Sequence, residues 1–193
     1  MPIVNLIHHR ELRKLQAQQS RRLVPNIVVL TVGRSGSSVT TQMLATALHL
    51  KTGKVDHNCE NLGIWSVNEK MRRDGIFDEM AALEALQSIG DPFIVKDPRW
   101  RDTLYLWWRV LKVFNPLLLF LEKRDRREVA KSIRKRGGLY TPELHKSCER
   151  QFRNWKGRKL RLQFEDVVEA SQLIDLSRLG RSVNSAEHHT SLP

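Results

Sequence analysis

The chain has 193 residues, which is enough for one domain with a substantial core and too few for a second full domain. Hydrophobic residues make up 40% of it, and five Trp and six Phe exclude the composition of a disordered protein. The formal net charge of +12 predicts attraction to polyanions, whether nucleotides, sulfated or acidic glycans, nucleic acids or anionic membrane surfaces.

Cysteine content and apolar runs narrow the class of protein further. Cys59 and Cys148 show neither a CxxC motif nor a zinc-type spacing, which favours free thiols in a reducing compartment and no metal site. The N-terminus lacks a basic head with an apolar core, and the longest apolar stretch, at residues 116–121, has the length of a strand. We therefore expect a cytoplasmic protein without a membrane span.

The N-terminal segment is polar and basic. Residues 8–22 are good helix formers with a narrow apolar stripe, which predicts a solvated helix on the edge of the domain. A polyanion-binding arm is the alternative for these residues. We assign residues 1–25 to a basic helical extension that Pro25 separates from the first strand.

A strand, a loop of small residues and a helix follow. Residues 27–30 are mostly β-branched, as in a parallel strand covered on both faces. Residues 31–38 (TVGRSGSS) form the loop, and a helix is expected from Val39 to a C-terminal Gly53. Such a turn leaves backbone N–H groups free at the positive end of a helix, which suits phosphate or sulfate, and Arg34 adds a forked cation. An ordinary turn without a ligand is the alternative.

The remaining chain alternates between helical and strand patterns. Helices are expected at residues 64–73, 78–88, 102–114, 128–136 and 141–157 and in a last segment that ends at Gly180. Strands are expected at residues 93–96, 117–121 and 160–164. Asp78, Asp102 and Thr141 are the expected N-caps.

Buried strands that alternate with helices predict an α/β fold. We expect an open, mainly parallel sheet of four to five strands with helices on both faces, formed by residues 26–180 and followed by a polar tail at 181–193. Ligands of such sheets bind beyond the carboxyl ends of the strands. Three of these ends carry basic groups: Arg34 after the first strand, Lys96 after the second, and Arg124 with Ser132 eight residues later after the third.

These motifs resemble those of sulfotransferases that use 3′-phosphoadenosine 5′-phosphosulfate (PAPS). The strand followed by Arg-Ser-Gly-Ser-Ser at residues 34–38 is similar to their 5′-phosphosulfate loop. The pair Arg124 and Ser132 is similar to the Arg and Ser that bind the donor's 3′-phosphate. Lys96-Asp97-Pro98 is similar to a motif of protein-tyrosine and bacterial carbohydrate sulfotransferases, and residues 164–166 to their Tyr/Phe-Glu-Asp strand end. Together these motifs spread over about residues 26–180, which is most of the chain.

The resemblance implies a P-loop-like sulfotransferase fold and in-line transfer of a sulfonyl group from PAPS, without a metal, to a hydroxyl or amine of a small-molecule or glycan acceptor. Its implied donor-binding residues are Arg34, Ser35, Gly36, Ser37, Ser38, Val39, Arg124 and Ser132. Its implied catalytic residues are Lys96 and Arg34, which neutralise charge on the leaving phosphate, and Glu60, which takes the acceptor proton. His57 is the alternative base.

The chain also departs from the family. Arg126 stands where Pro is common, and the glycine-rich C-terminal segment of the cytosolic members is absent. The short chain leaves few residues for an acceptor lobe, so either the acceptor binds at an open surface or a partner completes the site. We expect no specific nucleic-acid partner, and the oligomeric state stays open.

Two other functions remain alternatives. A P-loop kinase or triphosphatase requires Gly-Lys-Ser/Thr where this chain has Gly36-Ser37-Ser38, although Asp97 could be given the role of magnesium ligand. A non-catalytic polyanion-binding module explains the net charge but not the spacing of Arg124 and Ser132.

Overall fold

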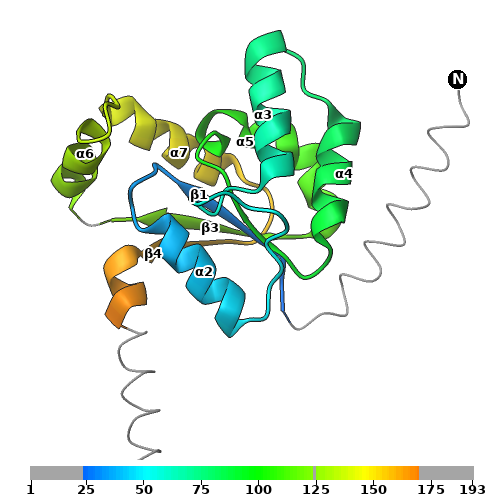
Figure 1. The fold of residues 1–193 in the computed structure, drawn as a ribbon, viewed down its shortest axis with the longest axis horizontal. Helices are drawn as coiled ribbons and strands as arrows, with labels where there is room; N and C mark the ends of the chain where they lie inside the picture. Colours follow the sequence, from blue (N-terminus) through cyan, green and yellow to red (C-terminus); the bar gives the residue numbers. More distant parts are fainter. Residues whose placement is uncertain (1–23, 124, 170–193) are drawn as a thin grey trace, which may run out of the picture.

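The computed structural model describes residues 24–123 and 125–169 (Figure 1). The predicted N-terminal helix at residues 8–22, Arg124, most of the last predicted helix and the tail at 181–193 lie outside the described residues.

The core of the fold is a parallel sheet of four strands. They are β1 (Ile27–Thr31), β2 (Ile94–Lys96), β3 (Leu117–Glu122) and β4 (Lys159–Gln163). Their order is β2-β1-β3-β4, and each neighbouring pair is parallel. The predicted α/β class and open parallel sheet are therefore confirmed. Since β1 lies between β2 and β3, the loops that follow these three strands meet at one edge of the sheet.

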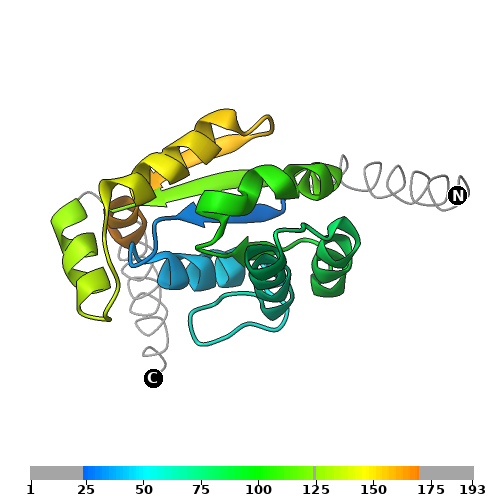
Figure 2. The same cartoon turned by 90° about the horizontal axis from the view of Figure 1, so that it is seen from above.

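Helices cover both faces of this sheet (Figure 2). The helices are α2 (Ser37–Ala47), α3 (Leu62–Asp74), α4 (Glu79–Ile89), α5 (Trp100–Leu111), the 3₁₀ turn η1 (Lys112–Phe114), α6 (Arg126–Arg134) and α7 (Pro142–Asn154). Val28 and Leu30 of β1 face the larger core, which α3, α4, α5 and α7 supply, whereas Ile27 and Val29 face α2. All five residues of β1 are buried, as its β-branched run predicts.

Three of the predicted helix boundaries were wrong. The helix α2 begins at Ser37 rather than Val39, because Gly36 takes the left-handed conformation at the N-cap, and it ends at Ala47, well before Gly53. The helix α5 begins at Trp100 rather than at an Asp102 cap, since the turn after Asp97 leads straight into it through a 3.1 Å hydrogen bond from Trp100 N to Asp97 O.

Two further differences affect the elements that flank the third and fourth strands. The helix α6 begins at Arg126 because the Asp125 carboxylate caps it, accepting hydrogen bonds from the backbone N–H groups of Arg127 and Glu128. Phe164 does not end a strand: β4 stops at Gln163, and residues 164–169 are helical.

The predicted caps had mixed outcomes. Asp78 caps α4, its carboxylate accepting a hydrogen bond from Ala81 N at 3.0 Å. Thr141 occupies the N-cap position of α7 and Pro142 its first turn, but the Thr141 side chain makes no capping hydrogen bond.

Candidate functional site

The loop between β1 and α2 has the backbone of an anion-binding turn. Gly33, Arg34 and Gly36 all have positive φ, at 84°, 57° and 79°. The Ser35 hydroxyl hydrogen-bonds to the Thr31 hydroxyl, which also accepts a 3.3 Å hydrogen bond from Gly33 N. These bonds use two short polar side chains to fold the loop back over the end of its own strand. Such a turn directs successive N–H groups toward one point.

The first turn of α2 is left without a cap. Gly36 has no side chain to accept from the first helical N–H groups, and no acidic residue lies in this turn. By contrast, the side chains of Asn61, Asp78 and Asp125 cap α3, α4 and α6. The amides at the start of α2 are therefore available to an external anion, and the helix dipole favours one there.

Phe164 supports the same loop from the face of the sheet that α2 covers. A Cβ atom added to Gly36 would lie 2.1 Å from the Phe164 ring, so the ring packs directly against the glycine backbone. Glycine is therefore required at this position for two reasons, its positive φ and its close approach to the ring.

Lys96 reaches the loop from the end of β2. Its Nζ donates a 3.0 Å hydrogen bond to Ser38 Oγ and a second hydrogen bond to the carbonyl oxygen of Asn58. An ammonium group has three donors, so one is left for a ligand. Burial lowers the pKa of Lys96, against the opposing attraction of Glu60. Lys96 is only 3% exposed, so its charged form is unfavourable in the absence of a counter-charge. An anionic ligand would stabilise that charged form.

Arg34 connects the loop to α6. Its Nε donates a 3.0 Å hydrogen bond to Ser132 Oγ, which joins two residues 98 positions apart in the chain. None of the described residues hydrogen-bonds to the two terminal nitrogens of Arg34, which leaves them for an anion. Arg124, the predicted partner of Ser132, lies outside the described residues.

Glu60 is held in place by an arginine that the sequence analysis missed. Its carboxylate lies 3.1 Å from Arg99 Nη1, and Arg99 also binds Asp97 at 3.0 Å and Glu69 at 2.6 Å. Burial alone would lower the pKa of Arg99, but the three carboxylates together raise it. Glu60 thus presents a fixed carboxylate, whereas His57 is 83% exposed and contacts its neighbours Asp56 and Asn58.

Asp97 is occupied by protein contacts. It is fully buried, and its carboxylate accepts hydrogen bonds from Asn68 Nδ2 at 3.1 Å, Arg99 N at 2.8 Å and Arg99 Nη1 at 3.0 Å. It therefore orients Arg99 and, through it, Glu60. In the part of the chain that the structure describes, no group of three or more His, Cys, Asp or Glu side chains could hold a metal ion.

These residues surround one pocket of about 410 Å³ at the carboxyl edge of the sheet. Its lining comes from the loop, the segment before α3, the end of β2 and the turn after α6: Gly33, Arg34, Gly36, Ser37, Ser38, Val39, Asn58, Glu60, Lys96, Pro98 and Arg136. Most of the predicted site residues are thus brought together. Ser35 is instead buried beneath the loop, Ser132 reaches the site through Arg34, and His57 is not part of the lining.

Three lining residues were not predicted: Asn58, Pro98 and Arg136. Pro98 belongs to the Lys-Asp-Pro motif, and Arg136 directly precedes the Gly137-Gly138 helix stop. The sequence did not indicate that Asn58 lines the pocket, because its contacts with Ser38 and Lys96 use its backbone carbonyl rather than its side chain.

Comparison with known proteins gave no match to this chain, whether to protein-family models, to curated proteins or to solved structures. None of the helices in residues 24–123 and 125–169 is long and apolar enough to cross a bilayer.

Proposed function

We propose that the chain is a sulfotransferase with a P-loop-like fold, which moves the sulfonyl group of PAPS to a hydroxyl or amine of an acceptor. The observation that carries the proposal is the double link across the pocket. Arg34 bonds to Ser132 while Lys96 bonds to Ser38, so the two motifs that resemble donor-binding motifs converge on one set of free amides.

Each side chain has a role that its position supports. The amides at the start of α2 and the free nitrogens of Arg34 would hold the 5′-phosphosulfate, and Ser132 with Arg124 the 3′-phosphate. The acceptor oxygen forms a bond to sulfur while the bond from sulfur to the phosphate oxygen breaks, and that oxygen keeps the electron pair. The remaining donor of Lys96 would stabilise the charge that develops there, and Glu60 would take the acceptor proton.

The kinase or triphosphatase alternative receives less support. Its magnesium ligand would have to be Asp97, whose two oxygens already accept three hydrogen bonds within the protein. A non-catalytic polyanion-binding module has no need of a buried ammonium such as Lys96, because surface cations attract polyanions without the cost of burial.

The proposal is tested by transfer of a labelled sulfonyl group from PAPS to a mixture of oligosaccharides in the presence of a chelator. We expect transfer to continue without metal, and Arg34→Gln to reduce it by about 100-fold. Arg153→Gln is the matched control, since Arg153 is exposed on α7 and does not line the pocket. Magnesium-dependent transfer of phosphate from ATP, with no transfer from PAPS, would refute the proposal.

A further inference from the structure

Arg136 lines the pocket from the α6 side, although it belongs to none of the predicted donor motifs. It lies in the turn that follows α6, four residues after Ser132 of the proposed 3′-phosphate site. The hydrogen bonds from Gly137 N to Arg134 O at 2.9 Å and from Gly138 N to Ile133 O at 3.1 Å fix this turn. No carboxylate among the described residues pairs with Arg136, which leaves its guanidinium for an anionic group of a ligand.

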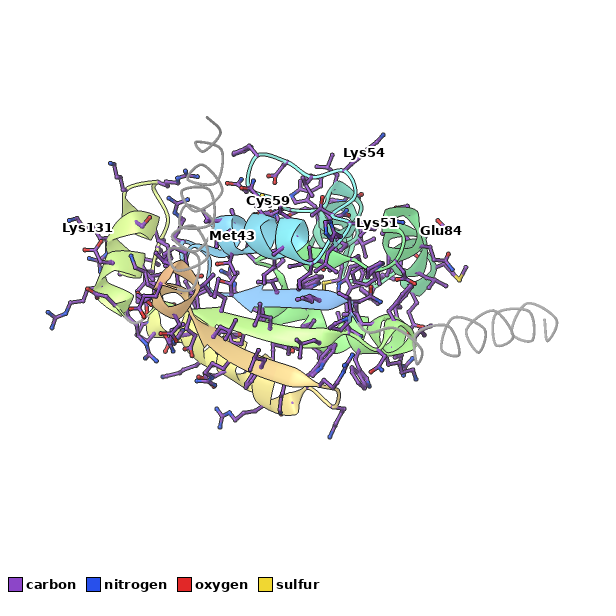
Figure 3. The ribbon with its side chains drawn as sticks, turned by 90° about the horizontal axis from the view of Figure 1, so that it is seen from below. Met43, Lys51, Lys54, Cys59, Glu84 and Lys131 are labelled. Atoms are coloured by element: carbon purple, nitrogen blue, oxygen red, sulfur yellow. The ribbon has the colours of Figure 1, made fainter. Side chains whose placement is uncertain are left out.

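Positive charge continues beyond the pocket along α6. Its exposed cations are Arg126, Arg127, Lys131, Arg134 and Lys135. Figure 3 shows Lys131 on this helix at the outer edge of the molecule. Of the two acidic residues nearby, Asp125 is used as the helix cap, and Glu128 lies in the first turn of α6. The basic surface is thus larger than the nucleotide donor requires, and it borders the pocket at Arg136.

An exposed aromatic ring lies outside the pocket lining, near its Glu60 side. Trp65, in the first turn of α3, is 42% exposed, and its ring centroid lies 5.7 Å from the guanidinium of Arg99. Arg99 in turn holds Glu60, so the ring stands next to the proposed base. Leu62, the first residue of α3, is 47% exposed. An exposed ring beside a polar pocket offers the apolar face that a sugar ring needs for stacking.

The two surfaces flank the phosphate-binding end of α2, since α6 and α3 stand on opposite sides of it in both views of the fold (Figures 1 and 2). We propose that the acceptor is an acidic carbohydrate chain that lies across the pocket from α3 to α6. In this arrangement Trp65 stacks on one sugar ring and Arg136 binds the carboxylate or sulfate group of another sugar of the same chain. The inference rests on the proposed function and names the substrate class of the same site.

A single-stranded nucleic acid fits this surface less well. Such ligands are bound by several aromatic side chains along a basic groove. Here one exposed tryptophan stands at one end, and the carboxylates of Glu60 and Glu69 lie beside it. Every nucleotide of a nucleic acid carries a phosphate, which those carboxylates would repel. An acidic glycan can instead place a neutral sugar there.

The test compares one oligosaccharide of alternating uronic acid and amino sugar with its carboxyl-reduced form, which has the same rings without the charges. We expect kcat/KM for the acidic form to exceed that for the reduced form by at least about 10-fold. Arg136→Gln should remove most of this preference through KM, and Trp65→Ala should raise KM for both forms. Arg153→Gln, an exposed cation of α7 that neither lines the pocket nor belongs to the basic surface of α6, should leave the preference within about 2-fold.

Affinity for 3′-phosphoadenosine 5′-phosphate (PAP), measured on the same variants, separates the inference from the proposed function. If PAP binds and labelled sulfonyl is transferred, but the two oligosaccharides are used equally, the acidic acceptor is wrong while the activity stands. If Arg136→Gln weakens PAP as much as the acidic acceptor, Arg136 is a donor contact and the inference fails. Tighter competition by single-stranded RNA than by the acidic oligosaccharide would also overturn it.

Discussion

At the scale of single residues, Lys96 is a buried cation with one hydrogen-bond donor left for a ligand. Charge develops on the leaving phosphate only during transfer, so a donor aimed there acts mainly on the transition state. We therefore predict that Lys96→Ala lowers turnover by about 100-fold or more and leaves donor affinity within a few fold. Steady-state kinetics and calorimetry on the same preparation measure both quantities. A variant that binds the donor poorly but turns over normally would make Lys96 a ground-state contact.

Glu60 is the proposed base because its carboxylate lines the pocket and is oriented by Arg99. Glu60→Gln keeps the size and most hydrogen bonding but removes basicity, so turnover at neutral pH should collapse while donor affinity stays unchanged. His57→Ala is the matched control, because His57 is 83% exposed and lies outside the pocket lining. Retained activity in Glu60→Gln together with lost activity in His57→Ala would assign the base to His57.

At the scale of elements, the phosphate loop contains two glycines, and only one of them packs against the segment after β4. A Cβ at Gly36 would clash with Phe164 at 2.1 Å, whereas a Cβ at Gly33 would meet nothing within 4 Å. Both residues have positive φ, so Gly33→Ala should cost only the backbone penalty of about 1 to 2 kcal/mol. We predict that Gly36→Ala costs about 2 kcal/mol more in urea unfolding.

The double variant Gly36→Ala/Phe164→Leu tests the cause of that loss. It should be more stable than the sum of the two single changes predicts, because the smaller side chain makes room for the added methyl group. Strict additivity would show that the ring contact does not limit the stability of the loop.

The junction of β3 and α7 gives the fold a pH-dependent stability. His145 Nε2 lies 2.8 Å from Glu122 Oε1, and Arg161 Nη1 lies 3.1 Å from the other oxygen of Glu122. Burial lowers the pKa of His145 below 6.5, and Arg126 adds to this, while Glu122 and Glu149 oppose it. The unfolded chain therefore binds the proton more readily, so stability is complete above the unfolded pKa and is lost as pH falls toward the folded one.

We predict that the free energy of unfolding decreases as the pH falls below about 7.5 and through the unfolded-state pKa of about 6.5, with a slope of at most about 1.4 kcal/mol per pH unit from this group. Urea unfolding at several pH values measures it. His145→Gln should flatten the profile, and the exposed His57→Gln should not. An unchanged profile in His145→Gln would assign the slope to other groups.

The sequence predicted the elements better than their boundaries. The buried runs of β1 and β3 and the Gly137-Gly138 stop after α6 are local signals, and the structure places strands and a helix end close to them. The helix starts predicted at Asp102 and Val39 were wrong because the backbone conformation of the preceding residues decides where a helix begins. Composition does not encode that conformation. Phe164 continues the apolar pattern of a strand, yet its ring packs against Gly36 from a helical turn.

At the scale of the whole molecule, the order of the strands assembles the pocket. Because β1 lies between β2 and β3, Arg34, Lys96 and Ser132 converge although they are distant in sequence. Once an open parallel sheet was assumed, the sequence could therefore predict that the residues after its strands lie together. Arg99 and Arg136 were not, since their roles depend on contacts with Glu60 and with the pocket that no local pattern encodes.

The proposed site for the 3′-phosphate includes Arg124, which lies outside the described part of the chain. Its spacing to Ser132 predicts that Arg124→Ala weakens PAP far more than 5′-AMP, by on the order of 1.5 to 3 kcal/mol for a lost charged bidentate contact. Calorimetric titration of both nucleotides measures the difference. Equal losses for the two ligands would contradict the assignment of the 3′-phosphate site.

We propose that the pocket holds a 3′-phosphorylated adenosine nucleotide without a metal. Calorimetric titration of the protein with PAP and with ATP, both in the presence of a chelator, measures this binding. We predict that PAP binds under these conditions and binds more tightly than ATP, because two separate anion sites, at α2 and at Ser132, match its two phosphate groups. Binding of ATP that appears only with magnesium, together with no binding of PAP, would show that the pocket is not a site for a 3′-phosphorylated nucleotide.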